Sequence, residues 1–298
     1  MPARLHHILF LTLLLLCVPH AASAGNSLEA DIAFLSDSLC AGRASGTGGA
    51  VEAAWYIRRR MEQLSLDPKI QTFSVVPDEG KDTVICHNVV AEIRRPGAER
   101  WIVITAFYDG LGVRGGAMYP GADSNASGVA ALLAMADSLS AAKGPFKGRY
   151  NILLAALDGH FADSEGAEEL WRRNLFRMNV RMAVNMDIVG SSLSPVQPYF
   201  KKYLMILGGA AYGRTLDALA FDKGLAVYYD YYGSRDFTNL FYRRMGDQKA
   251  FLAHGIPSVM VTSGITLHTN RTSDTSETLD YGQLESRVSL LLSWLEKL

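Results

Sequence analysis

The 298-residue sequence contains little cysteine and no excess of charge of either sign. None of its three cysteines forms a CxxC pair, which excludes a zinc–thiolate site. The 29 basic residues are balanced by 30 acidic ones, so the chain lacks the positive field that attracts phosphate backbones. We therefore expect no nucleic-acid partner. Internal repeats and low-complexity linkers are also missing, which favours a chain folded around a sizeable core.

The N-terminus has the pattern of a secretory signal peptide. Arg4 precedes an apolar run from Ile8 to Val18, and the small residues Ala22-Ser23-Ala24 follow. The run is shorter than the roughly 20 residues that a spanning helix needs. We predict a signal peptide over residues 1–24, cleavage before Gly25, and a secreted or periplasmic product with no membrane contact. A lipoprotein anchored at Cys17 is the alternative, although no small residue precedes Cys17.

Two cysteines remain in the mature chain, Cys40 and Cys86. An oxidising compartment permits a disulfide between them. Two isolated buried thiols are equally consistent with the sequence, so both interpretations stay open.

Helical and strand-like segments alternate along residues 25–298. Amphipathic helices are predicted over Leu28–Leu35 and about residues 50–64. Apolar runs that predict strands lie at 84–93, 101–107, 150–157, 182–189, 203–207, 225–229 and 258–262, and further helices are expected at 128–139, 165–174, 215–222 and 282–298. Several strands are apolar on both faces, which is typical of strands covered by helices on each side. We predict the α/β class: a single three-layer α/β/α domain with a mostly parallel, mixed central sheet.

Polar residues follow several of these strands directly. Asp109 follows the 101–107 run, Asp158 and His160 follow 150–157, and Asp187 lies near the end of 182–189. His268 comes after the last predicted strand. Chemistry in such sheets collects at the carboxyl ends of the strands, so these side chains are the candidates for a functional site.

Six short motifs, in order, resemble those of the secreted co-catalytic zinc aminopeptidases, relatives of bacterial leucyl aminopeptidase and glutamate carboxypeptidase. The motifs are Gly42-Arg43-Ala44-Ser45-Gly46-Thr47, Thr105-Ala106-Phe107-Tyr108-Asp109, Gly121 to Gly128 (GADSNASG), Asp158-Gly159-His160-Phe161, Asn185 to Gly190 (NMDIVG), and Gly255-Ile256-Pro257 with Leu267-His268-Thr269 and Ser273-Asp274-Thr275. The resemblance covers nearly all of the mature chain and implies a zinc-exopeptidase-like fold.

The same resemblance implies a metal site that has lost most of its ligands. The family binds two zinc ions through His, a bridging Asp, Glu, Asp and His, and a second Glu acts as general base. At the first His, bridging Asp, general-base Glu and ligand Glu positions the chain has Phe107, Ser124, His160 and Phe161, whereas only Asp187 and His268 keep their ligand types. Each metal would retain one protein ligand, and zinc affinity requires several ligands that converge.

We therefore expect a secreted member of the zinc aminopeptidase family whose dizinc site is largely lost. Zinc is implied by the resemblance, but we expect it to be absent or weakly bound, and the protein to be catalytically inactive. Its cleft then binds a peptide or a protein N-terminus. The alternative is an active metallo-exopeptidase with a remodelled centre, such as a single-metal site of Asp158, His160, Asp187 and His268. The oligomeric state stays open.

Other interpretations compete for the same residues. Asp109 is a candidate catalytic residue, or an acceptor that fixes its loop. Ser124 and His160, with a nearby aspartate, are also the residue types of a metal-free hydrolase, in which a serine nucleophile is activated by a histidine base. No GxSxG motif surrounds Ser124, however. We interpret Glu168 and Glu169 as solvated helix surface.

Overall fold

The computed structural model describes residues 24–76, 82–140, 147–192, 202–231 and 233–298. The predicted signal peptide lies almost wholly outside the described residues, so its prediction stays untested. Within the described ranges no helix combines the length and apolar character needed to cross a membrane. Cys40 and Cys86 are both buried and free, which settles the open question in favour of two separate thiols.

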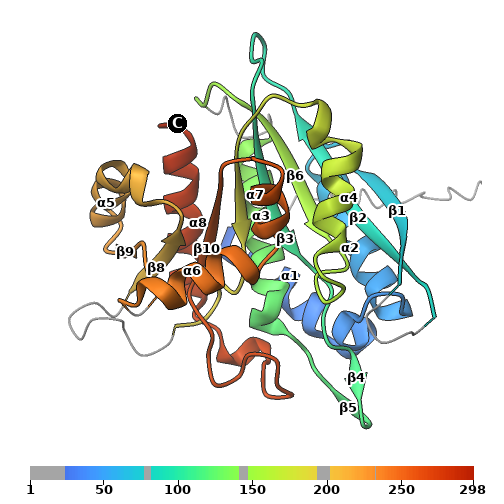
Figure 1. The fold of residues 1–298 in the computed structure, drawn as a ribbon. Coiled ribbons are helices and arrows are strands. Elements are labelled where there is room, and N and C mark those ends of the chain that lie inside the picture. Colours follow the sequence, from blue (N-terminus) through green and yellow to red (C-terminus); the bar gives the residue numbers. More distant parts are fainter. Residues whose placement is uncertain (1–23, 77–81, 141–146, 193–201, 232) are drawn as a thin grey trace, which may run out of the picture.

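An eight-stranded sheet forms the centre of the molecule (Figure 1). In spatial order it contains β1 (Lys69–Val75), β2 (Val84–Ile93), β6 (Asn151–Leu157), β3 (Trp101–Phe107), β7 (Val180–Met186), β10 (Ser258–Thr262), β8 (Tyr203–Leu207) and β9 (Ala226–Tyr228). The four central strands β6, β3, β7 and β10 are parallel. The pairs β1–β2, β2–β6 and β10–β8 are antiparallel, and β8–β9 is parallel. This mixed sheet with a parallel centre confirms the predicted fold class.

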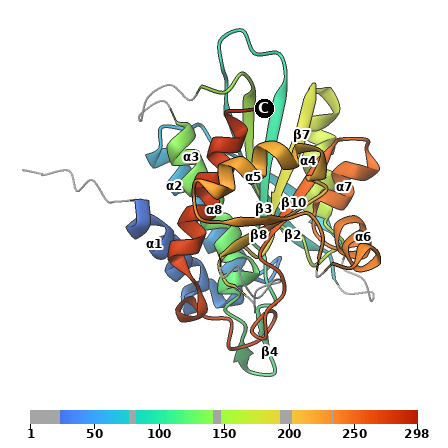
Figure 2. The same ribbon diagram turned by 90° about the vertical axis from the view of Figure 1, so that its left-hand side faces the viewer.

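Helices cover both faces of the sheet, giving three layers (Figures 1 and 2). One face packs against α1 (Ala24–Ser36), α2 (Gly48–Gln63), α3 (Ser127–Leu139), α5 (Gly213–Phe221) and α8 (Tyr281–Leu295). The other face packs against α4 (Glu165–Arg173), α6 (Arg235–Arg244) and α7 (Gln248–Ala253). The central strands β3 and β6 are buried along their whole length because both of their faces meet a helical layer.

Short elements connect these layers. They are the 3₁₀ segments Ser38–Arg43, Leu175–Arg177, Ala210–Tyr212 and Ser276–Thr278, the π-helical turn Ala122–Ala126, and the small hairpin of β4 (Val113–Arg114) and β5 (Ala117–Met118). The hairpin projects away from the sheet in Figure 1.

The sequence analysis missed β1, α6 and α7, as well as the two-residue strands β4 and β5. β1 is an edge strand in which buried and exposed residues alternate, so it lacks a continuous apolar run. α6 buries only Phe241 completely, and α7 has six residues. The strand predicted to reach Val189 ends at Met186, because the chain turns at Ile188, whose φ is 58°.

Candidate functional site

Asn125 joins the elements that meet at the carboxyl edge of the sheet. Its Nδ2 donates to the carbonyls of Phe107 at 3.2 Å and Met186 at 3.0 Å, which end β3 and β7. Its Oδ1 accepts from the backbone N–H groups of Gly128 at 3.2 Å and Ile188 at 3.0 Å. A Cβ at Gly128 would lie 2.4 Å from this oxygen, so only glycine fits at the start of α3. The side chains at the edge are thereby held on rigid elements.

Three aromatic rings pack together at this edge. The buried Phe107 ring stacks on His160 with 3.7 Å between ring centroids and 8° between planes. The Phe161 ring lies edge-on to both, at 6.1 Å from Phe107 and 5.1 Å from His160. Phe161 is 43% exposed, so part of its apolar ring faces solvent.

His160 forms a largely buried ion pair with Asp247, the residue that precedes α7. Its Nδ1 lies 3.0 Å from Asp247 Oδ1, and the side chains are 18% and 1% exposed. Burial acts to lower the pKa of His160, but the charge and hydrogen bond of Asp247, with smaller contributions from Asp187 and Asp109, outweigh it and raise the pKa to about 9. A protonated imidazole at neutral pH therefore stands where the family resemblance places a general base.

Asp109 holds the loop that carries His160. Its two carboxylate oxygens accept from the backbone N–H groups of His160 at 3.1 Å and Phe161 at 3.2 Å. Burial, followed by repulsion from Asp158, raises the pKa of Asp109 to about 7. Of its two predicted roles, the geometry matches the loop-fixing acceptor.

Asp158 is likewise occupied by local hydrogen bonds. Its Oδ1 accepts from Ser45 Oγ at 2.6 Å and the N–H of Gly159 at 2.8 Å. Its Oδ2 accepts from the N–H of His87 at 2.9 Å and the Tyr108 hydroxyl at 3.1 Å. These contacts hold the Asp158 carboxylate within the loops that surround the end of β6.

The π-helical turn places Ser124 beside a different set of groups. The N–H groups of Asp123 and Ser124 donate to the Asp274 carboxylate at 2.8 and 3.1 Å. Ser124 Oγ donates to Asn270 Oδ1 at 3.3 Å. No hydrogen bond joins Ser124 to His160 in the part of the chain that the structure describes, so the metal-free triad considered from the sequence is not assembled.

Asp123 lies one residue before the bridging position, but it faces the Gly190 loop. Its carboxylate accepts from the N–H of Gly190 at 2.8 Å, from Ser127 Oγ at 3.0 Å and, through a short bond, from Ser191 Oγ. These hydrogen bonds accompany the burial of Asp123 and fix its carboxylate to the loop after β7.

Asp187 and His268, the two retained ligand types, do not share a contact. The Asp187 side chain is 6% exposed and makes no hydrogen bond to another described residue. Burial raises its pKa to about 6, while His160 acts in the opposite direction. His268 is half-buried, and its Nδ1 lies 3.0 Å from Ser273 Oγ.

The donor set does not fit a two-zinc centre. Apolar rings occupy two ligand positions, a hydroxyl replaces the bridging carboxylate, and His160 faces Asp247. Within the described ranges no three His, Cys, Asp or Glu side chains are grouped so that they could hold a metal ion. This holds also for Asp158, His160, Asp187 and His268, the set considered for a single-metal site.

Sequence reasoning missed two residues that organise the site, Asp247 and Arg43. Asp247 lies between α6 and α7, two helices that were not predicted. Nothing in the sequence therefore placed it opposite His160. Arg43 was named only within the first motif and given no role of its own, yet its buried guanidinium donates to the carbonyls of Tyr108 at 2.7 Å, Pro120 at 2.7 Å and Gly121 at 2.8 Å. It also makes a short bond to the carbonyl of Leu35.

The two glutamates interpreted as solvated helix surface are both paired. Glu169 is 7% exposed, and its oxygens accept from Arg172 at 2.6 Å and Arg173 at 2.5 Å, which corrects the prediction. Glu168 lies 2.8 Å from His254 Nε2, and the His254 ring stacks on Trp171. The periodic pattern of the helix sequence does not show which arginine and histidine side chains pair with these glutamates.

The three-layer α/β fold with its mixed sheet is the zinc-exopeptidase-like fold that the motifs predicted, and the comparison with known families agrees with it. The model of peptidase family M28 matches residues 88–295, and the chain belongs to this family. A search of curated protein sequences gave no match.

Solved structures of similar fold include aminopeptidases and glutaminyl cyclases. The LapA aminopeptidase of Legionella pneumophila has a TM-score of 0.70 at 16% identity, covering 91% of this chain and 70% of that one. The zinc aminopeptidase BSAP of Bacillus subtilis has a TM-score of 0.69 at 14% identity, covering 90% and 93%. A glutaminyl cyclase of Porphyromonas gingivalis has a TM-score of 0.67 at 17% identity, covering 92% and 97%. At these identities the likeness concerns the fold.

Proposed function

We propose that this chain is a secreted, non-catalytic member of peptidase family M28 that binds no zinc, or binds it weakly, and uses its cleft to bind a peptide or a protein N-terminus. The observation that carries the proposal is the Phe107–His160 stack held by the His160–Asp247 ion pair. A charged imidazole donates hydrogen bonds and repels a metal cation. The phenyl rings of Phe107 and Phe161, at two of the ligand positions, offer no lone pairs to a metal. The general base and the convergent ligands that metal-assisted hydrolysis needs are therefore replaced.

The binding role rests on two groups at the carboxyl edge of the sheet. Asp187 keeps a carboxylate without a hydrogen bond among the described residues, and such a group can pair with the amine of a peptide N-terminus. The exposed face of Phe161 offers an apolar contact for the adjoining side chain. The two groups are consistent with recognition of an amine next to an apolar residue.

The decisive test is the zinc content of the purified protein after dialysis without a chelator. We expect well under one zinc ion per chain. One or two zinc ions per chain would overturn the proposal. The positive control is the variant with Phe107→His, Ser124→Asp, His160→Glu and Phe161→Glu, which returns the family's donor types to the same scaffold and is expected to bind zinc more tightly.

An active metallo-exopeptidase with a remodelled centre is the second candidate, supported by the retention of both Asp187 and His268 at the carboxyl edge. It predicts release of the N-terminal residue from aminoacyl p-nitroanilides in the presence of zinc, cobalt or manganese. Cleavage that disappears in Asp187→Asn and His268→Ala would establish it. No cleavage with any of the three metals would exclude it.

A further inference from the structure

A row of buried polar side chains lies beneath the site, between the sheet and α7. Side chains two positions apart on a strand point to the same face, so Thr105 lies below Phe107 on β3. In the same way Asn185 on β7 lies below Asp187, which directly follows that strand. Thr105 and Asn185 are paired in register between the two strands. Gln248, the first residue of α7, completes the row, and all three side chains are fully buried.

Hydrogen bonds link this row from strand to helix. Thr105 Oγ1 donates to Asn185 Oδ1 at 2.9 Å, and Asn185 Nδ2 donates to Gln248 Oε1 at 2.9 Å. Gln248 Nε2 donates to the backbone carbonyl of Tyr242 in α6 at 2.9 Å. The turn between α6 and α7 leaves room for this amide because it contains Gly246, where φ is 45° and a Cβ would collide with Gln248 Oε1. Both amides have partners for oxygen and nitrogen alike, so their orientation is determined.

Asp247 depends on the backbone for its position, because its carboxylate makes a single hydrogen bond. Oδ1 faces His160, and Oδ2 is buried without a partner among the described residues. α7 has six residues and no side-chain cap from Asp247, and so short a helix is not stable by itself. The ion pair of Lys249 with Asp163 also joins α7 to the His160 loop, but Asp163 is 80% exposed, and exposed ion pairs contribute little. Gln248, next to Asp247, is thus the buried polar anchor of this turn.

We propose that Asn185 and Gln248 are positioning residues of the candidate site, whose amide hydrogen bonds hold Asp247 opposite the imidazole. They act through Asp247 and keep the His160 ring stacked on Phe107. Apolar side chains of the same size would fill this space without the cost of burying amides, and the packing of α7 on its apolar neighbours has no preferred direction. The row therefore contributes direction. The inference rests on the proposed function in one respect, since the same His160–Asp247 pair carries both.

The test is the titration of His160, followed by the NMR signal of its Cε1–H and assigned by the loss of this signal in His160→Gln. EDTA is present, so the measurement does not involve zinc. In the wild type we expect a pKa of about 9. Gln248→Met keeps the length of the side chain and removes both of its hydrogen bonds, and Asn185→Leu removes the link to β7. Each should lower the titration midpoint by about one pH unit or more, because the Asp247 carboxylate moves away from the imidazole.

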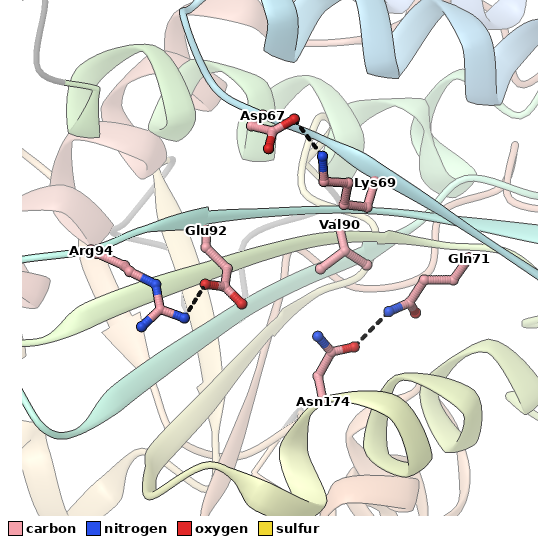
Figure 3. Close-up of a pocket in the computed structure, with 7 residues that line it drawn as sticks. All are labelled: Asp67, Lys69, Gln71, Val90, Glu92, Arg94 and Asn174. Atoms are coloured by element: carbon pink, nitrogen blue, oxygen red, sulfur yellow. Dashed lines mark hydrogen bonds and ion pairs between the residues drawn. The ribbon is translucent and has the colours of Figure 1, made fainter.

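The matched control is Gln71→Met on the edge strand β1, which contributes no residue to the site. Gln71 is likewise a buried glutamine, 8% exposed, and its Nε2 donates to Asn174 Oδ1 at 2.5 Å (Figure 3). This variant removes a comparable amide pair and should titrate as the wild type does. The other carboxylates that raise the pKa of His160 are those of Asp187 and Asp109, which are unaltered in every variant.

Two results would overturn the inference. One is that Gln248→Met and Asn185→Leu fold, by far-ultraviolet circular dichroism, and keep the wild-type midpoint; the other is that Gln71→Met shifts the midpoint as far as they do. If these two variants do not fold, Thr105→Val decides, because it keeps the shape of the side chain and removes only the first hydrogen bond. It should lower the midpoint by a smaller amount, and an unchanged midpoint would equally contradict the positioning role.

Failure of this inference is distinguishable from failure of the proposed function. The titration requires neither zinc nor a peptide, so an unchanged midpoint would leave the zinc measurement unaffected. Stoichiometric zinc in the purified protein would overturn the proposed function, and the midpoints measured in EDTA would still decide whether the buried row positions Asp247.

Discussion

The ion pair between His160 and Asp247 predicts how the stability of the protein depends on pH. The pKa of His160 is raised to about 9 in the folded protein and has its ordinary value of 6.5 in the unfolded chain. A raised pKa in the folded state contributes stability that is fully present below pH 6.5 and is lost as the pH rises through 9. At about 1.4 kcal/mol for each pKa unit, this contribution is on the order of 3 kcal/mol.

The perturbation is Asp247→Asn, which removes the charge and keeps the shape of the side chain. Because Asp247 is the strongest of the groups that raise the pKa of His160, the variant should lose most of this pH dependence. Urea unfolding of both proteins at pH 6.5 and pH 9 measures the difference. We expect the wild type to lose about 3 kcal/mol more than the variant over this interval.

Other titrating groups do not obscure the comparison. Asp109 and Asp187 have raised pKa values of about 7 and about 6, so they cost stability mainly as the pH rises from about 4 to 7. Burial raises the pKa of the Cys40 and Cys86 thiols, so near pH 9 they lose protons in the unfolded chain and not in the folded one. This contribution is the same in the wild type and in Asp247→Asn, and it cancels in the comparison. Equal free-energy changes in wild type and Asp247→Asn between pH 6.5 and pH 9 would refute the reasoning.

Three further predictions concern packing and covalent state. Phe107→Ala should lower the free energy of unfolding by about 3 to 5 kcal/mol, because it empties a fully buried ring site; a loss below 1 kcal/mol in urea unfolding would contradict the stacking described here. Arg43→Met should cost at least about 3 kcal/mol by the same assay, because four buried carbonyls lose their donor, whereas Arg58→Met on the exposed face of α2 should cost little. Cys40 and Cys86 should both react with a maleimide after unfolding without reductant, and peptide mass spectrometry that found them joined would show the free thiols to be wrong.

The strands that were predicted correctly are those whose apolar residues face helices on both sides. The bounds of β2, β3, β8 and β10 agree with the apolar runs. β1 was missed because an edge strand with one covered face needs polar residues at alternate positions. α6 was missed because a helix that rests on one buried ring, Phe241, has no long apolar stripe.

The sequence predicted which residues lie at the site but not how their side chains are oriented. Motifs placed Phe107, Asp109, His160 and Asp187 at one edge, because residues that end parallel strands meet there. The orientation of each side chain depends on partners distant in sequence. Asp247 lies 87 residues from His160, and no local pattern encodes that contact. The sequence left two roles open for Asp109, a catalytic residue or an acceptor that fixes its loop, and only the folded chain shows its two oxygens accepting from the N–H groups of the loop that follows β6.

The role of Asp109 changes how a substitution at this position should be interpreted. In a relative that uses the equivalent carboxylate for chemistry, Asp→Asn is a test of turnover. In this chain the same replacement removes an acceptor from two backbone amides, so its first effect should be misplacement of the His160 loop. Because Asp109 has this structural role, the presence of an aspartate at this position of the motif says nothing about whether hydrolysis survives.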